Sequence, residues 1–241
     1  MTMLRAALVL GLLSAVGPFA IDMYLPAMPL IATALDAEVS SVQFTLTAYF
    51  ISFGVAQLFY GLWSDQIGRK VPLYGGIGIF IVASIGCALA PTIGWLIAFR
   101  ILQGAGGAAL MVVPRAIIRD MHTGTQATKL LAMVILVISV SPMLAPLVGS
   151  GLIVIGDWRL IFWTLCLTAV LSLILTVTAL PETSLPSERV PLNLRNFVRG
   201  SNTLIRDPVF MGLTFIGGFG FASFMVFIAS AAFVYSGQFG L

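Results

Sequence analysis

Charged side chains are scarce in this 241-residue sequence, in which Asp, Glu, Lys and Arg make up 9% and hydrophobic residues 59%. Soluble domains carry about 25% charged residues, so this composition excludes an ordinary water-soluble protein. Histidine occurs once, at His122, and cysteine twice, at Cys87 and Cys166. These residues have no metal-ligand spacing, and neither a Ser/His/Asp set nor a glycine-rich phosphate loop accompanies them. We therefore expect no enzyme, no metal site and no bound cofactor.

Long apolar runs are abundant. A helix needs about 20 mostly apolar residues to cross a bilayer. The runs are continuously apolar rather than alternating in polarity, which favours helices over a transmembrane β-barrel. We predict an all-α polytopic membrane protein in a lipid bilayer, with seven spans at 6–27, 41–63, 72–90, 93–115, 130–152, 160–180 and 209–232.

Basic residues are distributed unevenly between the predicted loops. With a cytoplasmic N-terminus, ten of the twelve Lys and Arg residues fall in cytoplasmic segments, Arg159 lies outside and Arg100 lies within a span. Short basic loops stay in the cytoplasm, so we predict this orientation in a bacterial inner membrane. The basic residues of the cytoplasmic loops account for the net charge of +3. The positive charge is therefore no sign of a nucleic-acid partner, and we expect none.

The longest polar stretch divides the chain unequally. Residues 182–207 follow six spans and contain two prolines and four arginines, so we interpret them as a cytoplasmic linker. Residues 1–181 then form a six-helix bundle, and residues 208–241 hold a seventh span. A single remaining span has no obvious packing partner, so we expect the sequence to be an incomplete version of a longer protein.

The loop between the second and third spans carries a specific motif. Its sequence, GLWSDQIGRK from Gly61 to Lys70, resembles the G-x-L-a-D-r-x-G-R-K signature of the major facilitator superfamily. Glycines at both ends allow two helices to approach and turn sharply, and Asp65 and Arg69, four residues apart, can pair with each other or with helix ends. We predict a conformational latch at the cytoplasmic side made of Gly61, Asp65, Gly68, Arg69, Lys70 and Asp120.

Six further segments narrow the resemblance. They are DMYLPAMP at 22–29, RILQG at 100–104, RAIIRD at 115–120, SPMLAPLVG at 141–149, WR at 158–159 and LPET at 180–183. Together they resemble the drug/proton antiporter branch, and within it the Bcr/CflA subfamily of bicyclomycin and chloramphenicol resistance. The fifth span departs from the usual antiporter motif, because Ser141-Pro142 and Gly149-Ser150 replace a Gly-Pro and a Gly-Gly pair.

The resemblance implies a major facilitator fold. Residues 1–181 would form 3+3 inverted repeats, in which the first and fourth spans are equivalent and face a central cavity. The cavity of this superfamily lies between two six-helix halves, and we expect the full-length protein to be a monomer.

Two charges lie inside the predicted spans, Asp22 in the first and Arg100 in the fourth. A charge at the bilayer centre costs at least ~2.5 kcal/mol, so it normally faces a cavity or a partner. We place both charges at one depth and predict that Asp22 is the protonation site and that Arg100 tunes it. The alternatives are a solvated, interfacial Asp22 and an Arg100 that forms a structural pair or anchors on backbone carbonyls.

Prolines and amphipathic side chains complete the candidate site. Pro142 and Pro146 remove helix hydrogen bonds in the fifth span, so with Gly149 they indicate either a hinge or a static kink. Five residues would suit varied apolar drugs if they line the cavity, and otherwise they pack between helices: Tyr24, Tyr49, Gln103, Met111 and Met133.

The predicted function is multidrug efflux, in which a small amphipathic drug is exchanged for protons by alternating access. The proton is the coupling ion, and no other cofactor is expected. Two alternatives remain: a proton-coupled exporter of a metabolite such as an amino acid, and a non-transporting membrane sensor or assembly partner.

Overall fold

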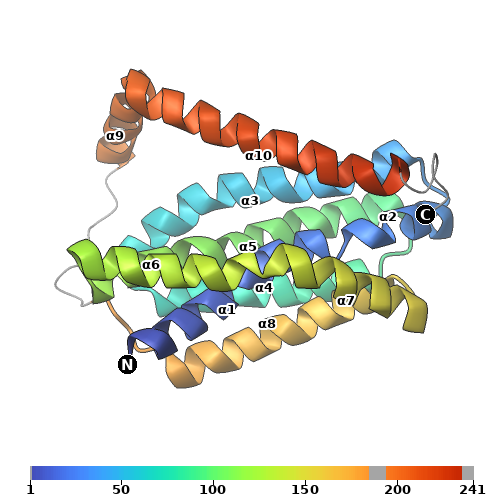
Figure 1. Ribbon diagram of the computed structural model, residues 1–241, viewed down its shortest axis with the longest axis horizontal. Coiled ribbons are helices and arrows are strands. Elements are labelled where there is room, and N and C mark those ends of the chain that lie inside the picture. The colour runs from blue at the N-terminus through green and yellow to red at the C-terminus, as the bar shows by residue number, and fades with distance from the viewer. Residues whose placement is uncertain (1, 185–193, 235–241) are drawn as a thin grey trace. The chain divides into compact units, whose positions relative to one another are not determined.

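The computed structural model describes residues 2–184 and 194–234, and every element within these ranges is helical (Figure 1). The chain forms two compact units, residues 1–190 and 191–241, each of which is described by itself.

The first unit holds six candidate membrane spans. Four are single helices, whereas the first and fifth are each interrupted. The elements are α1 (Met3–Asp22), η1 (Leu25–Ala27), α2 (Met28–Ala34), α3 (Val39–Ile67), α4 (Lys70–Ala88), α5 (Ile93–Met121), α6 (Gly124–Ser139), α7 (Ser141–Ile155) and α8 (Arg159–Ala179).

Several helices are longer than predicted. The fourth span was expected over 93–115 but runs from Ile93 to Met121, and the fifth was expected over 130–152 but runs from Gly124 to Ile155. Apolar runs mark only the part of a helix inside hydrocarbon. Charged residues at the ends are solvated in the headgroup region, so the backbone continues as a helix beyond the apolar run.

The first span is interrupted at its charged residue. Helix α1 ends at Asp22, and the chain continues through η1, which contains Pro26, into α2, which contains Pro29. Both prolines lack a backbone N–H, so the hydrogen-bond ladder cannot run through them unbroken. The predicted end near residue 27 is wrong, because the span extends to Ala34.

The fifth span is broken where prolines were expected to bend it. Val140 separates α6 from α7, Pro142 lies in the first turn of α7, and Pro146 lies inside that helix. Gly149 packs against the carbonyl group of Met23, where an added Cβ atom would collide with the backbone. The two interrupted spans therefore touch each other. Whether the break moves as a hinge stays a prediction.

Helix α5 forms the centre of the bundle and packs most extensively on α3 and α4 (Figure 1). Gly104 faces the carbonyl of Tyr49 on α3, and a Cβ atom at Gly106 would lie 2.6 Å from the backbone nitrogen of Phe80 on α4. Small residues permit such close approach between membrane helices. This packing holds the functional side chains of α5 in place.

The second unit contains α9 (Leu194–Arg206) and α10 (Pro208–Val234). Residues 208–227 form the seventh candidate span, as predicted. Helix α9 lies within the predicted linker, 182–207, where the sequence analysis did not predict a helix.

Candidate functional site

Arg100 is completely buried at 0% exposure in the middle of the first unit. Its Nη1 atom donates to the carbonyl oxygen of Ala20 at 3.1 Å and to Oε1 of Gln103 at 2.6 Å. Its guanidinium carbon lies 4.6 Å from the ring centre of Tyr24 and 4.4 Å from that of Tyr49. Aromatic faces attract a cation strongly where water is excluded, so these rings stabilise the buried charge.

A chain of hydrogen bonds extends from this cation. The amide nitrogen of Gln103 donates to Ser84 Oγ at 2.8 Å, and that hydroxyl donates to the carbonyl of Phe80 at 2.7 Å. Arg100 is thereby joined to α1, α4 and α5, while the Tyr49 ring comes from α3. Its Nε and Nη2 atoms are buried and have no hydrogen-bond partner within the described residues.

Asp22 is also buried, at 6% exposure, yet it does not pair with Arg100. Among residues 2–184 and 194–234, no hydrogen bond or ion pair involves its carboxylate. The guanidinium instead reaches the backbone of Ala20, two residues earlier, so the charges lie at similar positions along the bundle without touching. The backbone-carbonyl anchor, an alternative for Arg100, is present in this conformation.

The five predicted substrate residues lie in two different environments. Tyr24, Tyr49 and Gln103 are fully buried around Arg100, which agrees with the alternative that they pack between helices, whereas Met111 and Met133 are half-buried on α5 and α6. A groove of about 440 Å³ lies between α1 and α8, but none of the five lines it. That these five residues line a substrate cavity stays a prediction.

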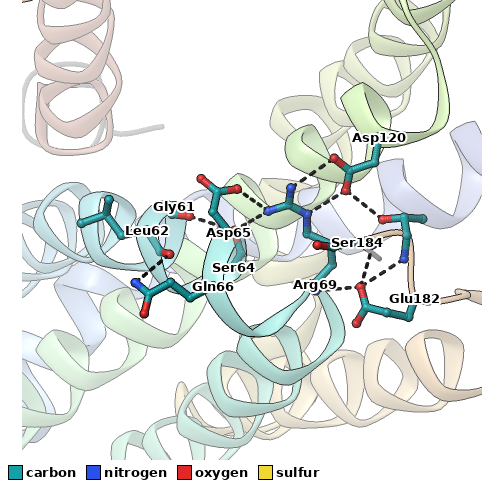
Figure 2. A network of polar contacts seen from close by, with 10 residues as sticks. Gly61, Leu62, Ser64, Asp65, Gln66, Arg69, Asp120, Glu182 and Ser184 are labelled. Atoms are coloured by element: carbon teal, nitrogen blue, oxygen red, sulfur yellow. Dashed lines mark hydrogen bonds and ion pairs between the residues drawn. The ribbon is translucent and has the colours of Figure 1, made fainter. Parts of the chain in front are cut away.

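At the opposite end of α5, Arg69 joins three helices in one charged cluster (Figure 2). Its Nη1 atom lies 2.6 Å from Asp65 Oδ1, and its Nε and Nη2 atoms donate to the two carboxylate oxygens of Asp120 at 2.7 and 3.1 Å. Nη1 also donates to Ser64 Oγ at 3.0 Å. The predicted grouping of Asp65, Arg69 and Asp120 is therefore observed, while its role as a latch stays a prediction.

Glu182 is a member of this cluster that sequence reasoning missed. Its carboxylate accepts the backbone N–H group of Arg69 at 2.9 Å (Figure 2). It also accepts the backbone N–H group of Lys70 at 3.0 Å, at the start of α4. Thr183 and Ser184 donate their backbone N–H groups to it as well, both at 3.1 Å. Partial burial favours a higher pKa for Glu182, but these four donors outweigh burial and lower the pKa. The sequence analysis singled out the segment LPET at 180–183, which contains Glu182. That segment did not reveal that Glu182 contacts α4.

The two glycines of the loop motif differ in their surroundings. Gly68 has a φ of 99°, which favours glycine and allows the sharp turn before α4. A Cβ atom at Gly61 would have no neighbour within 4 Å among the described residues, so the expectation that Gly61 permits close helix approach is not met in this unit. Lys70 contributes through its backbone N–H, and its ammonium lies 5.9 Å from the ring centre of Tyr74.

Six closely packed spans, with a buried cation inside and a charge cluster at one end, define a polytopic α-helical membrane protein. The chain belongs to the Major Facilitator Superfamily, because the model of that family matches residues 10–241. This membership also places the protein among transporters rather than enzymes.

Curated relatives support a narrower placement. The chain is 36% identical over 240 residues to the uncharacterized MFS-type transporter YdgK of Bacillus subtilis, covering 99% of this chain and 60% of YdgK. It is 32% identical to the bicyclomycin resistance protein homolog of Haemophilus influenzae, covering 97% and 59%. It is 35% identical to the multidrug resistance protein MdtL of Escherichia coli, covering 69% and 42%. The chain thus spans about 60% of the length of the first two relatives, and the resemblance to the bicyclomycin-resistance branch is confirmed.

Solved structures confirm the fold. The proton:xylose symporter XylE matches with a TM-score of 0.67 at 18% identity, covering 75% of this chain and 45% of XylE. The human organic anion transporter MFSD10 matches with a TM-score of 0.66 at 18% identity, covering 100% and 67%. At such identity the likeness concerns the fold alone.

Proposed function

We propose that the protein exports small amphipathic drugs in exchange for protons across the bacterial inner membrane, by alternating access. Relatives named for bicyclomycin and multidrug resistance support the substrate class. In this proposal the N-terminus is cytoplasmic, the working protein is a monomer, and the proton is the coupling ion. The Arg69 cluster then lies at the cytoplasmic end.

The observation that carries the proposal is the unpaired, buried carboxyl group of Asp22 at the break in the first span. An ionised carboxylate without a partner is costly to hold away from water. Its protonation is therefore sensitive to any movement that admits water or brings a cation close. Interrupted helices near the midplane form the ion and substrate sites of many transporters, which fits this location.

The proposed cycle uses the two charges differently. Arg100 is held by Ala20 and Gln103 and still has free N–H groups, so a shift of α1 can bring Asp22 within reach of the guanidinium. In that state the ionised carboxylate is stabilised, and in the present one it is not. Moving a proton inward supplies about 2.3 kcal/mol per 100 mV, which can drive drug movement outward.

The test replaces Asp22 with Asn in the full-length protein, which is then reconstituted in lipid vesicles. Asn is nearly the same size and cannot ionise, so drug binding should persist while drug-induced proton release and proton-driven efflux are lost. The matched control is Asp36→Asn, which makes the same change at an exposed acid beyond the end of α2. Proton release that equals wild type in the Asp22 variant would place the proton site elsewhere.

A second pair of variants tests Arg100. Arg100→Lys keeps the charge but loses the planar fork that reaches Ala20 and Gln103 together, so partial activity should remain. Arg100→Ala should remove coupling and also destabilise the core, because the Tyr24 and Tyr49 rings lose the group between them.

Resistance profiling in a host without its own pumps separates drug export from the two alternatives. Resistance to several chemically unrelated apolar drugs is expected. Export restricted to one metabolite such as an amino acid would favour the first alternative. The absence of any transported compound would favour a sensor or assembly partner.

A further inference from the structure

Helix α9 has a composition unlike that of the spans. Its thirteen residues include Arg195, Arg199 and Arg206 and no acidic residue. At 1.5 Å per residue the helix is roughly 20 Å long, too short to cross the hydrocarbon core. A helix of this kind needs a different environment from that of α10, which is almost entirely apolar.

The connection between α9 and α10 is very short. Asp207 alone separates the helices, and its backbone N–H donates to the carbonyl of Leu204 at 3.2 Å. The carboxylate of Asp207 accepts the N–H groups of Val209 at 2.8 Å and Phe210 at 3.1 Å, so it caps the first turn of α10. Because α10 begins as a candidate span directly after this cap, α9 must end at the membrane boundary.

The direction and the residue pattern of α9 both fit the membrane surface. Figure 1 shows α9 turning sharply away from the axis of α10 within the second unit. Arg199 and Arg206 are seven residues apart, which places them on the same side of the helix. Leu204 and Ile205 occupy positions on the other side. A helix that is basic on one side and apolar on the other is typical of helices lying in the headgroup region.

We propose that α9 lies in the surface of the membrane and binds anionic phospholipids through Arg199 and Arg206. A lipid surface is favoured over a soluble partner because α9 is continuous with a membrane span and carries only positive charge. It follows six spans, so it lies on the side that the basic loops assign to the cytoplasm, where anionic lipids are exposed. The segment between the spans is thereby a lipid-binding element, independently of the substrate transported.

The experiment uses the full-length protein in vesicles of phosphatidylcholine, with or without phosphatidylglycerol. Cys87 and Cys166 are replaced by Ser, and Ser201→Cys in α9 is labelled with an environment-sensitive fluorophore. Spin-labelled phosphatidylglycerol and spin-labelled phosphatidylcholine then serve as quenchers. Wild type should show quenching by both lipids, with clear preference for the anionic lipid.

Charge variants identify the source of that preference. Each arginine near an anionic surface contributes roughly a five-fold preference, so the double change Arg199→Gln and Arg206→Gln should reduce the preference about twenty-five-fold. Changing both residues to Lys should retain the preference for the anionic lipid, because the lipid recognises the positive charge and not the shape of the guanidinium group. Arg5→Gln, at an exposed arginine near the N-terminus, is the control and should leave it unchanged.

Three results would overturn the proposal. Equal quenching by the two lipids in wild type, or a preference that survives the double Gln change, would show that these arginines do not bind anionic lipid. A label that neither lipid quenches would show that α9 lies away from the bilayer, as it would if a protein surface covered it.

Discussion

Replacing Glu182 with Gln should loosen the connection between the end of the sixth span and the start of α4. The carboxylate accepts the N–H groups of Arg69 and Lys70, and α4 has no capping side chain of its own. Gln is similar in size but has one carbonyl oxygen in place of two. It can keep only part of these bonds, and it carries no charge to attract the positive end of the helix.

The expected cost follows from this geometry. Loss of a helix cap costs about 1 kcal/mol, and loss of a negative charge at a helix start costs ~0.3 to 1 kcal/mol. The Glu182 residue as a whole is exposed to solvent, although its carboxylate is partly buried against the backbone donors, so the charge contribution belongs at the low end of that range. The variant should therefore lose about 1 kcal/mol of unfolding free energy, which is roughly a five-fold change in an equilibrium constant.

The dependence on pH gives a sharper test. The pKa of Glu182 is lowered despite partial burial, because the backbone donors stabilise the ionised form. Its contribution to stability is therefore complete above the ordinary glutamate pKa of roughly 4.3 and is lost as the pH falls through the lowered value. The stability difference between wild type and Glu182→Gln should shrink in the same range.

Thermal unfolding can be followed in detergent with a thiol-reactive fluorophore, since Cys87 is buried until the bundle opens. The control is Glu38→Gln before α3, whose carboxylate makes no capping bond to that helix, and it should change stability by less than about 0.5 kcal/mol. An unfolding temperature equal to wild type at neutral pH, or a deficit unchanged at acid pH, would refute the capping argument for Glu182.

Two other substitutions test the packing of α5 and the Arg69 cluster. Gly104→Ala should destabilise the protein by about 1–3 kcal/mol in the same assay, because the new methyl group meets the carbonyl of Tyr49, whereas Gly78→Ala, in open space, should not. Asp65→Asn should change stability by only ~0 to 1 kcal/mol, because its side chain is 51% exposed, yet it should slow drug efflux in vesicles. A normal efflux rate in that variant would count against the latch.

The sequence alone determined the class of protein and the number of spans. Apolar runs of this length have no stable place in water, so hydropathy is enough to locate helices in a bilayer. The pair Asp65 and Arg69 was also predictable, because they are only four residues apart in the sequence and the tight turn at Gly68 keeps them close. The prolines of the fifth span predicted its break, because a missing N–H has a local effect on any helix.

Only the tertiary structure decided which distant groups meet. Glu182 contacts Arg69 across 113 residues of sequence, and no local pattern reveals which helix start a carboxylate will cap. The same limit explains why Asp22 and Arg100 are not paired. A buried guanidinium takes whichever acceptors and aromatic faces the packing brings to it, and here those are Ala20, Gln103 and two tyrosine rings.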